Sequence, residues 1–212
     1  MLIHAGDCTN VGAQKGVRQF VEWFQNLKGY DTKIFIAGNH DWAFYRNPAW
    51  LSGVINDENL SQSDVVYLQD SGFVIEDPGF SRPIKFWGSP WQPEFCNWAF
   101  NVPRGKLGKY WELIPKDTDV LITHGPPQEI RDFAQMSQTA QGCSELRFHV
   151  ETRIRPALHV FGHLHESYGA MALNDTLYVN ASTATLRYEM INKPIVVDLI
   201  EVADEVIAIK VD

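Results

Sequence analysis

Four apolar segments of this 212-residue chain each end in a short cluster of polar side chains, and this recurrence limits the folds open to it. Short apolar runs bounded by glycine or polar residues are typical of strands buried in a parallel sheet. The carboxyl ends of such strands share one edge of the sheet, where open α/β folds place ligands. We therefore expect the polar clusters to meet. The segments are residues 2–5 before Gly6-Asp7, residues 33–37 before Gly38-Asn39-His40-Asp41, residues 120–123 before His124, and residues 158–161 before Gly162-His163-Leu164-His165.

The segment between the first two strands has the spacing of an amphipathic helix with a glycine cap. A strand–helix–strand order predicts a parallel crossover unit. We expect residues 1–212 to form one domain. The apolar helix positions are Val17, Phe20, Val21, Phe24 and Leu27, with Gly29 as the cap; further strands are expected at 65–68, 73–75 and 84–87, a helix at 144–154, and a hairpin at Asn174-Asp175.

The net charge and the cysteines exclude several classes of protein. A formal net charge of −8 argues against sequence-independent binding of duplex DNA, which needs a basic face. A small anionic substrate is compatible with this charge if bound cations supply local positive charge. Cys8, Cys96 and Cys143 match neither a zinc-finger spacing nor a disulfide framework, so we expect reduced thiols in a cytoplasmic protein. With no apolar run of about 18 residues and no signal-peptide pattern, we expect no membrane association.

The polar clusters offer five candidate ligands for divalent metal ions: Asp7, Asn39, His124, His163 and His165. Taken alone, the first two are turn or cap residues and His124 is a hydrogen-bonded core histidine. His163 and His165 are two apart in an extended segment, so they point the same way. Carboxylate, amide and imidazole groups suit Mn, Fe or Zn, and the lack of thiolates disfavours a structural zinc site. Two such ions, about 3.5–4 Å apart, can clamp a phosphoryl group and activate a water molecule.

In this order, the four motifs resemble those of the calcineurin-like metallophosphoesterase superfamily. The segments Gly38-Asn39-His40-Asp41 and Gly162-His163-Leu164-His165 carry most of the resemblance. Nearly the whole chain is similar to one subfamily, the metallophosphoesterase-domain-containing proteins, through segments such as 88–93, 101–105, 123–127 and 142–146. The resemblance implies a layered α/β sandwich of two mixed sheets flanked by helices. It also implies hydrolysis of phosphodiester bonds, including those of cyclic nucleotides, or of phosphomonoester bonds.

The resemblance also implies a role for each motif residue. Asp7 would bridge two metal ions; Asn39, His124 and His163 would complete one site, and His165 would serve the other. His40 would protonate the leaving-group oxygen, and Asp41 would orient His40. This division is chemically sensible, because a general acid must stand near the leaving oxygen while other groups hold the ions. The remaining histidines, His4, His149 and His159, match no motif position and are expected to be structural.

One feature of the superfamily is absent from the sequence: a first strand ending in Asp-x-His, which supplies two ligands. The chain begins at Met1, five residues before Gly6. Either a natural N-terminal strand is lacking or the chain is a reduced variant. We favour the first alternative, because an unfilled central strand position would expose backbone donors and acceptors. We therefore expect one metal ion to bind firmly and a second weakly or not at all, with low turnover.

Two alternative functions follow from the same residues. A metal- or nucleotide-binding protein without catalysis is compatible with the missing ligands, whereas the positioned acid His40 favours an enzyme. A metal-dependent hydrolase of another bond type, such as a lactamase, is disfavoured because its His-rich ligand string is absent.

An aromatic segment between residues 87 and 100 is the candidate substrate wall. Trp87, Trp91, Phe95, Trp98 and Phe100 either form a rigid loop packed on the core or supply a ring that stacks on a nucleobase, and Trp91 is our candidate for that ring. Two arginines, Arg104 and Arg131, are either solvated or hold a phosphate oxygen in a bidentate contact.

Overall fold

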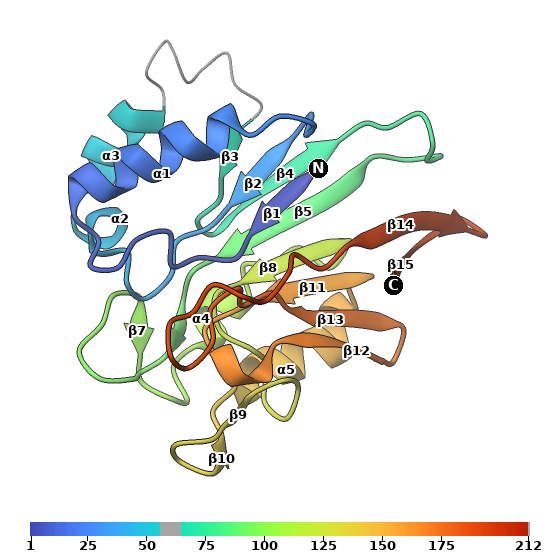
Figure 1. Ribbon diagram of the computed structural model, residues 1–212. Coiled ribbons are helices and arrows are strands. Elements are labelled where there is room, and N and C mark those ends of the chain that lie inside the picture. The colour runs from blue at the N-terminus through green and yellow to red at the C-terminus, as the bar shows by residue number, and fades with distance from the viewer. Residues whose placement is uncertain (56–64, 212) are drawn as a thin grey trace.

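Two β-sheets form the centre of the computed structural model, which describes residues 1–55 and 65–211 (Figure 1). The smaller sheet contains only parallel pairs, in the order β1-β2-β3. The larger sheet is mixed and has the order β12-β13-β11-β8-β5-β4, with antiparallel pairing at both edges and parallel pairing in the middle. The strands are β1 Leu2–His4, β2 Lys33–Phe35, β3 Val65–Tyr67, β4 Ser71–Ile75, β5 Ile84–Ser89, β8 Val120–Thr123, β11 Leu158–Phe161, β12 Gly169–Leu173 and β13 Thr176–Asn180.

Alternating side chains in the strands build three apolar layers. Ile34 and Ile36 point between the two sheets, where they meet Val120 and Ile122 of β8. Phe35 points the opposite way, toward the helices that cover the smaller sheet. Because successive side chains of a strand face opposite sides, one short apolar strand contributes to two of the layers. The sequence expectation of a layered α/β sandwich is confirmed.

Helices cover the outer faces of both sheets. Helix α1 buries Val17, Phe20, Val21 and Phe24 against the smaller sheet, as their spacing predicts. The helix ends before Leu27, which is already extended, so Gly29 does not act as the direct cap and instead occupies the following turn with φ of 85°. The helices are α1 Gln14–Asn26, α2 Trp42–Arg46, α3 Pro48–Ile55, α4 Gly108–Trp111 and α5 Ser144–His149, the last continuing into the π-helical turn η1 Val150–Ile154.

The C-terminal strands divide between two sheets. Strands β12 and β13 join the larger sheet, and the hairpin turn expected at Asn174-Asp175 is confirmed, with both residues at positive φ. Among the described residues, strands β14 Val197–Val202 and β15 Glu205–Lys210 pair with each other as a separate hairpin. The remaining elements are β6 Gln92–Pro93, β7 Asn101–Val102, β9 Phe133–Ala134, β10 Thr139–Ala140 and the 3-10 turn η2 His165–Ser167.

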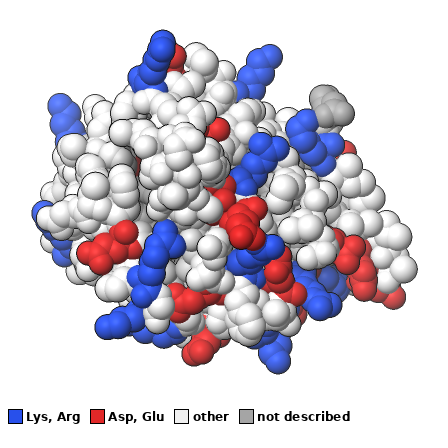
Figure 2. All heavy atoms as spheres, turned by 90° about the horizontal axis from the view of Figure 1, so that it is seen from below, with Lys and Arg blue, Asp and Glu red and all other residues white. Residues whose placement is uncertain are grey.

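The distribution of charged side chains and the state of the cysteines were also compared with the expectations from the sequence. In the view from below, Lys and Arg are interspersed with Asp and Glu rather than gathered into a continuous basic area (Figure 2). The three cysteines are free thiols, of which Cys143 is buried. No helix within the described residues is long and apolar enough to cross a bilayer.

The buried His159 leads to a prediction about stability. This side chain is fully enclosed in the larger sheet, with Nε2 located 2.9 Å from Thr123 Oγ1. Burial lowers the pKa of His159 from 6.5 to about 3. Below pH 6.5 the unfolded chain therefore binds a proton that the folded chain does not, and stability falls as the pH falls.

Replacing His159 with Leu is expected to flatten the dependence of the unfolding free energy on pH. The slope should decrease by about 1.4 kcal/mol per pH unit between roughly pH 6 and pH 4. Urea denaturation of both proteins at a series of pH values measures this slope. Parallel curves for the two proteins would show that His159 is protonated equally in the folded and unfolded chains.

Candidate metal centre

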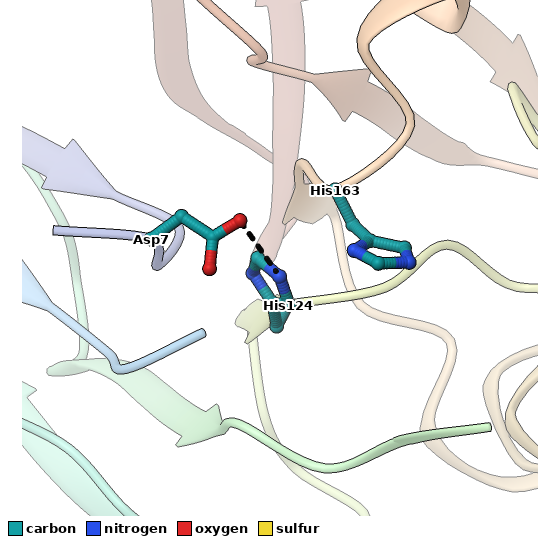
Figure 3. Close-up of side chains that lie close together, drawn as sticks. All are labelled: Asp7, His124 and His163. Carbon is teal, nitrogen blue, oxygen red and sulfur yellow. Dashed lines mark ion pairs between the residues drawn. The ribbon is translucent and has the colours of Figure 1, made fainter. Parts of the chain in front are cut away.

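Side chains from the carboxyl ends of strands in both sheets converge at one point. Ligand atoms of Asp7, His124 and His163 all lie within 4.8 Å of one another (Figure 3). Asn39 Oδ1 lies 2.9 Å from His124 Nε2 and 2.9 Å from His163 Nδ1. Four of the five ligands proposed from the sequence are therefore adjacent, although they come from four separate segments of the chain.

Two motif glycines allow this close approach. A Cβ atom on Gly38 would lie 2.4 Å from Asp7 Oδ1 and 2.5 Å from His124 Cε1. A Cβ atom on Gly6 would lie 2.6 Å from His124 Nδ1, and Gly6 also has a φ of 96°, which favours glycine. Side chains at these two positions would push the ligand-bearing loops apart, so the glycines are a steric requirement of the cluster.

Two of the candidate ligands have left-handed backbone conformations. Asp7 has a φ of 57° and His163 a φ of 67°. Non-glycine residues in this region are unfavourable by about 1 kcal/mol or more, and they concentrate at functional sites. Here the conformation turns each side chain out of its strand direction and toward the cluster.

The electrostatics of the cluster suit a cation. Burial by itself would raise the pKa of Asp7, but the neighbouring His124, whose Nε2 is 3.4 Å from Asp7 Oδ2, lowers it well below its usual range. Burial likewise opposes a charge on His124, but the carboxylate of Asp7 outweighs it and raises the pKa of this imidazole. Both nitrogens of His124 face acceptors, since Nδ1 is 2.9 Å from Ala5 O and Nε2 faces Asn39 Oδ1. The donor set therefore fits a divalent cation, which would take the position of the proton on Nε2.

Backbone carbonyls orient three imidazoles near the cluster. The Nδ1 atom of His40 lies 2.6 Å from the carbonyl oxygen of Asn10. In the same way, Nδ1 of His124 lies 2.9 Å from Ala5 O, and Nδ1 of His165 lies 3.0 Å from Thr185 O. A proton on each Nδ1 leaves Nε2 directed away from the carbonyl. His165 is not part of the group formed by Asp7, His124 and His163, so the structure separates it from the other candidate ligands.

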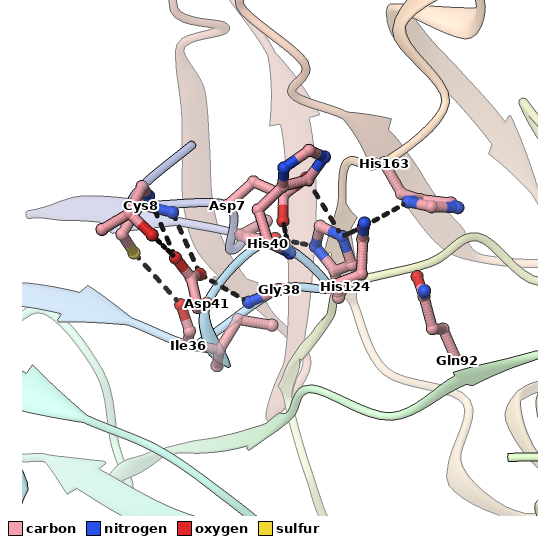
Figure 4. A network of polar contacts seen from close by, with 12 residues as sticks. Asp7, Cys8, Ile36, Gly38, His40, Asp41, Gln92, His124 and His163 are labelled. Carbon is pink, nitrogen blue, oxygen red and sulfur yellow. Dashed lines mark hydrogen bonds and ion pairs between the residues drawn. The ribbon is translucent and has the colours of Figure 1, made fainter. Parts of the chain in front are cut away.

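Asp41 holds two loops together rather than orienting His40. Its Oδ1 accepts hydrogen bonds from Thr9 N and Thr9 Oγ1, and its Oδ2 from Cys8 N and Gly38 N, at 2.8–3.0 Å (Figure 4). The expected contact with the His40 ring is corrected, because Asn10 O makes it instead. Burial, followed by the nearby charge of Asp7, raises the pKa of the fully buried Asp41 to about 6.

The three residues proposed to bind substrate are engaged with the protein itself. The indole N–H of Trp91 donates to Asp70 Oδ2, and the Trp91 ring stacks on Tyr110 with the ring centroids 4.2 Å apart. This arrangement agrees with the alternative of a rigid loop packed on the core. Arg104 donates to the carbonyl oxygens of residues 141 and 142, and Arg131 to those of residues 168 and 170. Main-chain carbonyls thus take donors of both guanidinium groups, and the indole N–H of Trp91 is engaged by Asp70.

Other aromatic rings stand against the imidazoles. Trp98 lies 4.3 Å from the His40 ring, Phe95 lies 6.0 Å from His163, and Tyr188 lies 5.5 Å from His165. Phe95 and Tyr188 are 54% and 69% exposed, so both rings are accessible from solvent. The aromatic segment pointed to Phe95 and Trp98 as a group, but no sequence signal identified Tyr188 or the carbonyl acceptors.

A cavity of about 660 Å³ opens beside the cluster and extends along β1 into the space between the sheets. Asp7, His40, His124, His163 and His165 line its polar end, and no Lys or Arg is among the described residues that line it. Outside the cluster, His4 packs against two phenylalanine rings, His149 contacts Arg153, and His159 contacts Thr123.

The sequence of this chain matches a family model and several known proteins. The family model described as calcineurin-like phosphoesterase matches residues 1–167. Metallophosphoesterase domain-containing protein 1 of Homo sapiens is 42% identical over 218 residues, which cover 94% of this chain and 64% of that protein; the Mus musculus protein gives the same values. UPF0046 protein T07D4.2 of Caenorhabditis elegans is 36% identical over 222 residues, covering 94% of this chain and 54% of that protein.

The chain thus spans less than two thirds of the length of these relatives. A solved crystal structure superposes with a TM-score of 0.57 at 15% identity, covering 79% of this chain and 63% of that one. A likeness at this identity supports the fold alone.

Removing the Asp41 carboxylate is expected to destabilise the protein strongly. Asp41→Ala leaves the buried N–H groups of Cys8, Thr9 and Gly38 without their acceptor, and the unfolding free energy should fall by about 2–4 kcal/mol. Thr9→Val, which keeps the carboxylate and its three backbone bonds, should cost about 1 kcal/mol. Urea denaturation of the metal-free proteins measures both losses, and equal losses would contradict the loop-joining role of Asp41.

Proposed function

Because the chain belongs to the calcineurin-like phosphoesterase family, we propose that it is a metal-dependent phosphoesterase that prefers phosphodiesters carrying an aromatic or nucleoside group. The observation that carries this proposal is the convergence of Asp7, Asn39, His124 and His163 beside an accessible cavity. Family membership supports metal-dependent phosphoester hydrolysis in general. The preference for diesters rests on the shape and charge of the cavity.

Four ligand atoms would hold one cation firmly: a carboxylate oxygen of Asp7, Asn39 Oδ1, His124 Nε2 and His163 Nδ1. A divalent ion in this position would stabilise negative charge on a phosphoryl group and acidify a water molecule. His165, outside this group, would contribute to a second and weaker site. Mixed oxygen and nitrogen donors are suitable for Mn, Fe or Zn.

We assign His40 the role of general acid. Its Nδ1 faces Asn10 O at 2.6 Å, so the proton that can be transferred is the one on Nε2. Its backbone N–H donates to Asp7 Oδ1 at 2.9 Å, which fixes the imidazole at the edge of the ligand cluster. In the protonated state, Nε2 can give its proton to the leaving-group oxygen of a phosphoester bound there.

The cavity favours a diester over a monoester. A phosphodiester carries one negative charge near neutral pH, whereas a monoester approaches two. Within the described part of the chain, no Lys or Arg lines the cavity to neutralise a second charge. Tyr188 lines the cavity, whereas Phe95 and Trp98 stand against His163 and His40 outside its lining; the three rings offer apolar surfaces for an aromatic substituent.

A comparison of His40→Ala with His149→Ala tests the catalytic proposal. With added Mn²⁺, hydrolysis of an aryl phosphodiester should fall about 100-fold or more in kcat for His40→Ala, because its acid is lost. His149, on α5, contacts Arg153 and should be replaceable without effect on kcat. Metal binding without turnover in the wild-type protein would favour a non-catalytic binding role.

Substitution of Phe95 by Ala tests the aromatic preference. The ratio of kcat/KM for an aryl or nucleoside diester to that for a dialkyl diester should fall about tenfold, because stacking contributes roughly 1–3 kcal/mol per ring. Phe148→Ala is the matched control, since Phe148 is a 63% exposed ring on α5. An unchanged ratio in Phe95→Ala would eliminate this ring as a specificity determinant.

A further inference from the structure

Gln92 has a buried side-chain amide whose orientation is fixed by its neighbours. The residue is 1% exposed, and its Nε2 donates to Asn101 Oδ1 at 3.1 Å. The amide nitrogen of Asn101 donates to the carbonyl oxygens of Phe95 and Cys96, both at 3.0 Å. Asn101 Oδ1 is therefore an acceptor, so Gln92 must present its NH₂ group to it. The Gln92 oxygen then points the other way.

This oxygen has no donor among the described residues, and it is closed to solvent. A buried acceptor without a donor costs about 1–3 kcal/mol, so it needs a reason to persist. Gln92 lies against the segment that follows His124, since a Cβ atom on Gly125 would be 3.6 Å from Gln92 Cβ. Figure 4 shows the amide directed toward His124 and His163.

His163 differs from the other imidazoles of the site. His40, His124 and His165 each place Nδ1 against a backbone carbonyl, but His163 directs Nδ1 at Asn39 Oδ1. Asn39 Oδ1 is an acceptor, so in the metal-free arrangement the proton of neutral His163 is on Nδ1. No acceptor for His163 Nε2 is present in the part of the chain that the structure describes.

A cation bound at Nδ1 would require the proton of His163 to be on the other nitrogen. A ligand nitrogen carries no proton and a ligand imidazole is neutral, so His163 would then carry its proton on Nε2. A ligand imidazole is held in place when its second nitrogen donates to a protein acceptor. His163 is thus a donor that needs an acceptor in the metal-bound state, and Gln92 Oε1 is an acceptor that lacks a donor in the metal-free state.

We propose that Gln92 is a positioning residue of the metal centre, whose side-chain oxygen accepts the Nε2–H of His163 once a cation is bound. The inference rests on the metal site of the proposed function. Gln92 thereby fixes the tautomer and the ring plane of His163, and its bond to Asn101 ties that geometry to the loop that carries Phe95.

Zinc titration calorimetry of the metal-free protein tests this role with three variants. Gln92→Met keeps the length of the side chain but has no amide, and it should weaken Zn²⁺ binding about 10- to 100-fold. Gln92→Glu retains an acceptor toward His163 but loses the N–H that faces Asn101 Oδ1, so it should bind Zn²⁺ more tightly than Gln92→Met. Asp7→Asn removes a ligand and calibrates the assay. If Gln92→Met binds Zn²⁺ as tightly as wild type while Asp7→Asn binds it more weakly, the role of Gln92 is overturned and the metal site stands.

A second measurement does not depend on the folding of any variant. In ¹⁵N-histidine spectra of the Zn²⁺-loaded wild-type protein, His163 should show a protonated Nε2, whereas the metal-free protein should show a protonated Nδ1. A protonated Nδ1 in the loaded protein would overturn coordination through Nδ1 of His163, and with it the hydrogen bond from Nε2 to Gln92 Oε1. Failure of the wild-type protein to bind Zn²⁺ at all would overturn both this inference and the metal site on which it rests.

Discussion

The contact between the Asp7 carboxylate and the His124 imidazole joins the two sheets at the functional end of the molecule. Asp7 follows β1 of the smaller sheet, and His124 follows β8 of the larger one. Each group shifts the other toward its charged form, although both are in a region where burial opposes charge. Gly6 and Gly38 provide the space for this approach. Without this pairing, the ligand atoms from the two sheets would have no common centre.

The sequence predicted this arrangement well where a residue's role follows from its own position in a strand. Ile34 and Phe35 are adjacent and apolar, and the two-residue period alone sends them to different layers. The candidate ligands Asn39, His124 and His163 lie in the loops that follow β2, β8 and β11, so the parallel topology brings them together. Their selection as metal ligands came from a resemblance of motifs. The structure adds the geometry, not the identity of a metal.

The role of a residue could not be predicted from the sequence where it depends on the group that lies opposite that residue in space. Arg104 could reach a phosphate oxygen or a main-chain carbonyl, and only the folded chain shows that carbonyls occupy its donors. Asp41 adjoins His40 in sequence, yet its oxygens face the Cys8–Thr9 segment. Main-chain carbonyls such as Asn10 O carry no side-chain signature at all, so no sequence pattern could have identified the group that orients His40.

The charge of the ligand set links the metal centre to the class of substrate. Asp7 is the only charged side chain among the four ligands that converge, since Asn39 is neutral and a ligand imidazole is neutral. A divalent cation held by this set would keep a net charge near +1 with its immediate ligands, which would suit the single negative charge of the diester proposed as substrate. The lining residues that the structure describes add no Lys or Arg to this field, so selectivity would come from the metal centre and from the rings beside it. An acidic protein can bind an anion in this way, because the field in the cavity depends on the bound ion rather than on the charge of the whole chain.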